Sequence, residues 1–131
     1  MPVLKTNVSG LYFADGQLSF VGARDALIEF GSQLNTRVAI TIEFAQVPLV
    51  SPYLSQASLV HVCVETEPGV SVTPDGDAVR VCGHPDAIAM LSHNIETFGR
   101  RPDFGDHIHE EYFPGHFYLR PESTPLVVQT A

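Results

Sequence analysis

The alternation of hydrophobic and polar residues predicts two β-hairpins. Apolar residues alternate with polar ones on both sides of Asp15-Gly16, between residues 11 and 21, and again around Asp75-Gly76, between residues 70 and 81. An Asp-Gly pair between alternating apolar residues is typical of a hairpin, because both central turn positions tolerate positive φ. Each half of the chain therefore begins with two antiparallel strands.

An amphipathic helix is predicted after each hairpin. Apolar residues then recur every three or four positions, which is the spacing of one buried helix face. We expect helices over residues 23–34 and 85–98. When the two halves are aligned on their hairpins and helices, Leu27 and Ile88 should occupy corresponding positions.

The remaining apolar runs predict strands on both sides of a proline-containing loop, residues 46–56. The expected fold is α+β, with two pseudo-symmetric ββαββ repeats, residues 7–65 and 70–129, forming a largely antiparallel sheet with two helices packed on it. Two such units sharing one core make residues 1–131 a single domain. These strands lie at 37–44, 59–65, 107–112 and 125–129.

Composition restricts the partners and the compartment. The 131 residues include 15 acidic and 7 basic side chains, a formal charge of −8. Nucleic acid and anionic lipid would be repelled by this charge, whereas a basic partner would be attracted. Because no apolar stretch resembles a signal peptide or a membrane span, we expect a cytoplasmic protein. Cys63 and Cys82 are then core thiols, with a disulfide as the alternative.

A His-x-His-x-Glu pattern suggests one candidate metal site. Alternation along a strand places His107, His109 and Glu111 on one face, where two imidazoles and a carboxylate could bind zinc. His116 and Asp106 are near enough in sequence to complete such a site. On this interpretation the protein is a metal-dependent hydrolase or a small-molecule-binding protein. The favoured interpretation is structural, in which these side chains are the solvent-facing side of the strand.

The short motifs of common enzymes are missing from the sequence. It contains no HExxH, GxSxG, P-loop or GxGxxG pattern. This favours a binding protein over an enzyme, and we expect no cofactor, with zinc as the alternative.

Aromatic residues are concentrated in residues 112–119, on both sides of Pro114-Gly115-His116. Such a segment commonly folds over a core and seals one edge of a sheet. Alternatively it forms a contact surface, because Tyr and Phe beside acidic residues resemble the anchors and rim of a protein interface.

Three short patterns occur together in the C-terminal part. A helix starts at Gly83, Ala87 and Ile88, a strand carries His-x-His at residues 107–109, and a closing strand carries the Ser-x-x-Leu-Val-Val pattern of residues 123–128. In this combination the chain resembles the Imm32 family of immunity proteins from bacterial polymorphic toxin systems. The chain departs from this pattern in two places. In the first half Ala39-Ile40-Thr41 stands where the His-x-His would fall, and in the second half Glu110 stands where an apolar residue is expected.

The resemblance implies a protein that binds and neutralises a cognate toxin by protein–protein contact inside the producing cell. If the toxin is basic, acidic residues would accelerate its encounter with this protein. A homodimer is an alternative use of exposed sheet edges. The candidate partner-binding residues are Asp103, Asp106, Glu110, Glu111, Tyr112, Phe117, Tyr118 and Glu122.

Overall fold

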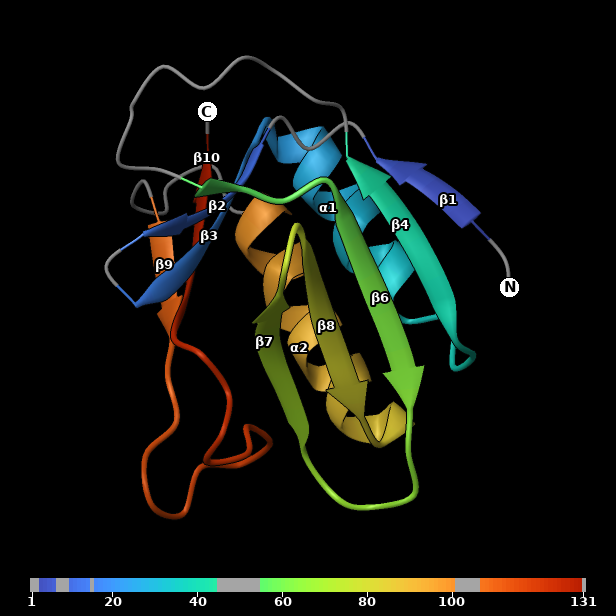
Figure 1. The fold of residues 1–131 in the computed structure, drawn as a ribbon, viewed down its shortest axis with the longest axis vertical. Coiled ribbons are helices and arrows are strands. Elements are labelled where there is room, and N and C mark those ends of the chain that lie inside the picture. Colours follow the sequence, from blue (N-terminus) through green and yellow to red (C-terminus); the bar gives the residue numbers. More distant parts are fainter. Residues whose placement is uncertain (1–2, 7–9, 15, 45–54, 101–106, 131) are drawn as a thin grey trace.

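The described residues form two helices and two five-stranded sheets (Figure 1). The structure, a computed structural model, describes residues 3–6, 10–14, 16–44, 55–100 and 107–130. Among these residues, no helix is both long enough and apolar enough to cross a membrane.

The first sheet has the strand order β1-β4-β6-β8-β7. Its pairs β1–β4 and β6–β8 are parallel, whereas β4–β6 and β7–β8 are antiparallel. The Asp-Gly turn expected around Asp75 joins β7 to β8, as the alternation predicted. The strands span Val3–Thr6 (β1), Ile40–Phe44 (β4), Leu59–Val64 (β6), Val70–Asp75 (β7) and Ala78–Gly83 (β8).

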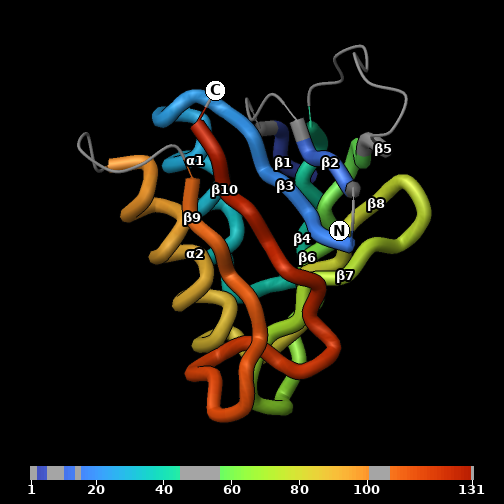
Figure 2. Tube along the Cα trace, turned by 90° about the vertical axis from the view of Figure 1, so that its left-hand side faces the viewer, coloured from blue at the N-terminus to red at the C-terminus, as the bar shows by residue number. Residues whose placement is uncertain are grey.

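The second sheet has the order β5-β2-β3-β10-β9 and is also mixed. Only β3 and β10 are parallel within it, and the other three pairs are antiparallel. Figure 2 shows β3, β10 and β9 side by side. The strands span Gly10–Ala14 (β2), Gln17–Gly22 (β3), Ser55–Gln56 (β5), His107–Glu110 (β9) and Leu126–Thr130 (β10).

The helices α1 (Arg24–Leu34) and α2 (Pro85–Arg100) pack directly on each other. Their backbones approach closely at Gly31, where an added Cβ would lie 3.0 Å from the carbonyl oxygen of Ser92. The Ser92 hydroxyl donates a short hydrogen bond to the Gly31 carbonyl. A glycine at this crossing therefore allows a contact that a larger residue would obstruct.

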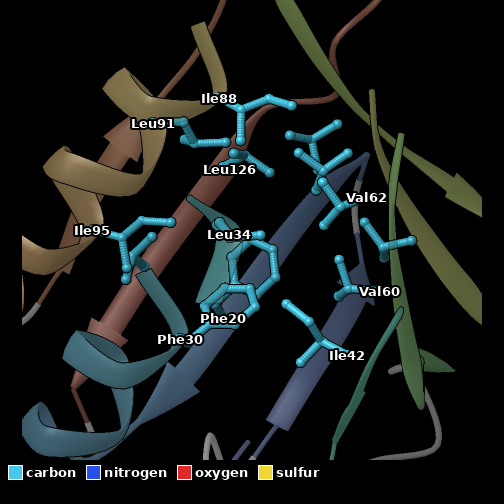
Figure 3. Close-up of a cluster of buried hydrophobic side chains, with 14 of the residues drawn as sticks. Phe20, Phe30, Leu34, Ile42, Val60, Val62, Ile88, Leu91, Ile95 and Leu126 are labelled. Carbon is cyan, nitrogen blue, oxygen red and sulfur yellow. The ribbon is translucent and has the colours of Figure 1, made fainter. Parts of the chain in front are cut away.

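One cluster of buried apolar side chains connects both helices and both sheets. Figure 3 shows Phe30 and Leu34 of α1 and Leu91 of α2 meeting side chains from both sheets, among them Phe20 and Val62. Phe30 is fully buried, and its ring lies 5.0 Å from that of Phe20. Burial of these side chains is the main stabilising contribution to the fold.

The α+β class is confirmed, but the strands form two mixed sheets rather than one largely antiparallel sheet. The reason is that the halves exchange strands: β10 of the second half pairs with β3, and β6 of the first half pairs with β8. Alternation predicts which face of a strand is buried, and it leaves the neighbouring strand unspecified.

The two sheets follow the same plan. Each combines the hairpin that precedes one helix with the strand pair that follows the other helix. Leu27 and Ile88 are each the fourth residue of their helix, and both are buried. Descent from an internal duplication nevertheless stays a prediction.

Two strands were not predicted. The strand β1 lies before the first hairpin and pairs with β4, whereas Ser55 and Gln56, expected in a loop, pair with β2 as β5. The other residues of the expected loop, 46–54, lie outside the described residues.

Candidate protein-binding surface

The fifteen residues between β9 and β10, residues 111–125, form the aromatic loop, seen at the lower left of Figure 1. This loop covers the outer edge of β7. The Val70 amide donates to the Tyr118 carbonyl at 2.8 Å, and the Arg120 amide donates to the Val70 carbonyl at 2.9 Å. Further along, the Thr124 amide donates to the Val72 carbonyl. The loop thus protects an edge strand that would otherwise be open to pairing.

Arg120 attaches the aromatic loop to the loop that precedes β7. Its guanidinium donates to a Glu65 carboxylate oxygen at 2.6 Å and to the carbonyls of Glu67 and Pro68, each at 3.1 Å. Gly69, at φ +86°, makes room for this side chain, because a Cβ there would lie 2.9 Å from Arg120 Cγ. The planar fork of donors therefore holds two loops together.

His116 organises the turn at the tip of the loop. Its Nδ1 accepts hydrogen bonds from the amides of Tyr118 (3.1 Å) and Leu119 (2.9 Å), and therefore carries no proton in this arrangement. The ring also lies 4.8 Å from the rings of both Phe113 and Tyr118. The imidazole is a structural part of the turn, separate in role from the histidines of β9.

The aromatic side chains divide into a buried set and an exposed set. Tyr118 and Leu119 are buried, and Tyr112 packs partly against the core. Phe117 is 83% exposed and Phe113 is 58% exposed. The segment therefore combines residues that cover the core with aromatic rings that are exposed.

Two hollows flank Phe117. One, of about 280 Å³, lies against α2 and is lined by Ala87 and Met90, and the other, of about 260 Å³, lies along the loop toward Pro121. They share Pro68, Gly69, Phe117 and Tyr118 in their walls. An exposed phenyl ring between two concave surfaces resembles the anchor and pockets of a protein interface.

A polar cluster lies behind this surface, between α2 and β9. The Asn94 amide donates to Glu110 at 3.1 Å and to the Tyr118 hydroxyl at 2.7 Å. Burial raises the pKa of Tyr118 above its usual range, and the adjacent Glu110 carboxylate adds to this effect. Glu110, which stands where an apolar residue was expected, is half-buried in the edge strand β9, and its carboxylate accepts this hydrogen bond from Asn94.

The candidate residues are distributed as follows. Glu111 and Glu122 are exposed on the aromatic loop, whereas Glu110 is turned toward Asn94. Tyr118 is largely unavailable to a partner because it is buried. Asp103 and Asp106 lie outside the described residues.

The proposed metal ligands are only partly brought together. His107 and His109 are exposed neighbours on β9, with rings 4.8 Å apart. His116 is engaged in the turn through Nδ1. Within the described parts of the chain, no three His, Cys, Asp or Glu side chains are grouped closely enough to hold a metal ion.

Cys63 and Cys82 face each other across the parallel strands β6 and β8, and both are free thiols. Burial raises the pKa of Cys82 to about 11, with a further contribution from its hydrogen bond to Cys63. A thiol that holds its proton so strongly is a weak nucleophile at neutral pH.

Sequence reasoning did not identify Arg120, the residue that fixes the loop. A signal was present, because Arg120 is the only Lys or Arg in residues 107–131, among several carboxylates. Its acidic partner comes from the β6–β7 loop, 55 residues earlier in the chain, so the pairing itself could not be predicted.

The comparison with known families points to the same part of the molecule. Residues 78–131 match the family model described as Immunity protein 32 (Imm32), so this segment is similar to the family that the sequence patterns suggested. The match includes β8, α2, β9, the aromatic loop and β10. No curated protein and no solved structure was found to match the chain.

Proposed function

We propose that this protein is an immunity protein that binds and neutralises a cognate bacterial toxin inside the producing cell, using the aromatic loop as its contact surface. The observation that carries this proposal is Phe117. This large apolar side chain is 83% exposed on a loop fixed by Arg120, within the segment that matches the immunity family.

The arrangement has the properties of an interface anchor. A phenyl ring in water gains free energy when a partner covers it, and a well-supported loop loses little conformational entropy on binding. The same loop also exposes Phe113, Glu111 and Glu122, which add a second aromatic ring and two carboxylates to its surface. Such a rim suits a basic toxin, since opposite charges accelerate association.

The test uses the protein encoded next to this protein's gene as the candidate toxin. Isothermal titration should show saturable binding of the purified toxin to the wild-type chain. Phe117→Ala should weaken that binding about 30-fold or more, as expected for an anchor residue. A matched control is Val38→Ala, which truncates an apolar side chain that is 53% exposed outside the loop, and which should bind as the wild type does.

The proposal would be wrong if the toxin did not bind the wild-type chain. Equal affinities for the wild type and the Phe117→Ala variant would exclude the aromatic loop as the contact surface. Circular dichroism of each variant shows whether a loss of binding reflects unfolding.

A further inference from the structure

The strand β9 (His107–Glu110) is the last strand of the second sheet, and among the described residues it pairs only with β10. An edge strand of this kind presents backbone N–H and C=O groups that another strand can pair with. Charged and polar side chains, the usual protection of an edge, are present here as His107, His109 and Glu110.

The first sheet shows how an equivalent edge is completed. There β4 pairs with β6 so that Ile42 is opposite Val60, as Glu110 of β9 is opposite Leu126 of β10. The outer edge of β4 is covered by β1, which runs parallel to it. In the second sheet β9 corresponds to β4 and β10 corresponds to β6. No described strand lies beside β9 where β1 lies beside β4.

The cover of β4 also indicates which chemistry would suit a strand that pairs with the outer edge of β9. Lys5 of β1 is opposite Glu43, a cross-strand pair of opposite charge. Glu43 directly follows Ile42, just as the exposed Glu111 directly follows Glu110. A strand that covered β9 in the same way would therefore place a residue opposite Glu111, where a Lys or Arg would be favoured.

The helices beside the two edge strands make different hydrogen bonds, and this agrees with the presence of a covering strand on β4, whereas no described strand covers β9. In α1 the Gln33 side chain donates to the Lys5 carbonyl at 2.7 Å and so holds β1 in place. Asn94 of α2 directly precedes buried Ile95, as Gln33 precedes buried Leu34. Asn94 instead donates to Glu110 and Tyr118, within the protein itself.

We infer that β9 is a docking edge for an extended segment of the partner protein, which adds to the second sheet with a Lys or Arg opposite Glu111. This inference rests on the proposed function, because the partner is taken to be the toxin. The added strand would extend the contact from the aromatic loop, which begins at Glu111, along the adjacent sheet edge.

Hydrogen–deuterium exchange of the wild-type protein, alone and saturated with the purified toxin, tests the inference. The amides of residues 107–111 that point away from β10 should exchange about tenfold or more slowly in the complex, because an added strand would accept their hydrogen bonds. Residues 40–44 of β4 are a suitable reference, since β1 already covers that edge.

Three other outcomes would overturn the inference, and they differ from one another. Protection of the aromatic loop without β9 would refute the docking edge and leave the proposed function intact. Protection of β9 that appears in the free protein as its concentration rises would assign the edge to a second copy of the chain. An absence of toxin binding would refute the proposed function as well.

A charge-neutralising variant tests the residue opposite Glu111. Glu111→Gln should weaken toxin binding by up to about fivefold, the upper end of the range for a cross-strand charge pair. Asp77→Asn removes an exposed carboxylate at the β7–β8 turn and should leave the affinity unchanged. Equal affinities of the Glu111→Gln variant and the wild type would exclude a cation at that position.

Discussion

Replacing Arg120 by Met should release the aromatic loop from the loop before β7. The side chain of Arg120 is 15% exposed, and its guanidinium makes three hydrogen bonds: to Glu65, Glu67 and Pro68. Methionine has an apolar side chain about as long as the aliphatic part of arginine, so the variant mainly removes the hydrogen-bond donors of the guanidinium.

The expected loss of unfolding free energy follows from the exposure of the groups that Arg120 contacts. Glu65 is 43% exposed, and an ion pair with such a partner contributes at most about 1 kcal/mol. Each carbonyl contact contributes about 1 kcal/mol more. We therefore expect the free energy of unfolding to fall by about 2–3 kcal/mol, which for a chain of this length lowers Tm by about 8–12 °C.

Urea unfolding monitored by circular dichroism measures this change. The Arg120→Lys variant is the matched control, because it keeps the charge but loses the fork, and it should lose about half as much stability. If Arg120→Met unfolded within about 0.5 kcal/mol of the wild type, the attachment of the loop by Arg120 would be refuted.

Three further predictions concern the helix contact, a buried thiol and the acidic rim. Gly31→Ala should lower the free energy of unfolding by about 1–3 kcal/mol in urea titrations, because the added Cβ would overlap α2. This loss is expected although alanine has a better helix propensity than glycine. The control Ser32→Ala, at an exposed position of α1, should not lower the free energy of unfolding. The pKa of Cys82 is raised from 9.0 to about 11, so the folded state retains this proton where the unfolded state loses it. The free energy of unfolding should therefore fall as pH rises from 9 to 11, and it should fall less steeply in the Cys82→Ala variant than in the wild type. Urea titrations that gave the same pH dependence for both proteins would contradict this. Glu111→Lys and Glu122→Lys should slow toxin association in stopped-flow experiments at low salt, and a difference that persisted at 0.5 M salt would argue against electrostatic attraction.

The helices were the most predictable part of the fold. The observed α1 and α2 differ by one or two residues from the ranges expected, because their apolar periodicity and flanking glycines are local signals. The hairpins around Gly16 and Gly76 were predictable for the same reason. The exchange of strands between the halves was not, because pairing between distant segments leaves no local pattern.

The candidate site was predictable in its location more than in its details. The aromatic composition of the loop and the acidic residues near it indicated a contact surface, and Phe117 is indeed exposed. The burial of Tyr118 and the turn of Glu110 toward Asn94 depend on tertiary contacts with α2. A single sequence contains no direct record of such contacts.

Growth of bacteria that produce the toxin is the most direct measurement of the central claim. Cells that also produce the wild-type protein should grow, and cells that produce the Phe117→Ala variant at the same level should stop growing. Equal protection by the two proteins would contradict the aromatic loop as the neutralising surface, and a lack of protection by the wild type would contradict the immunity function itself.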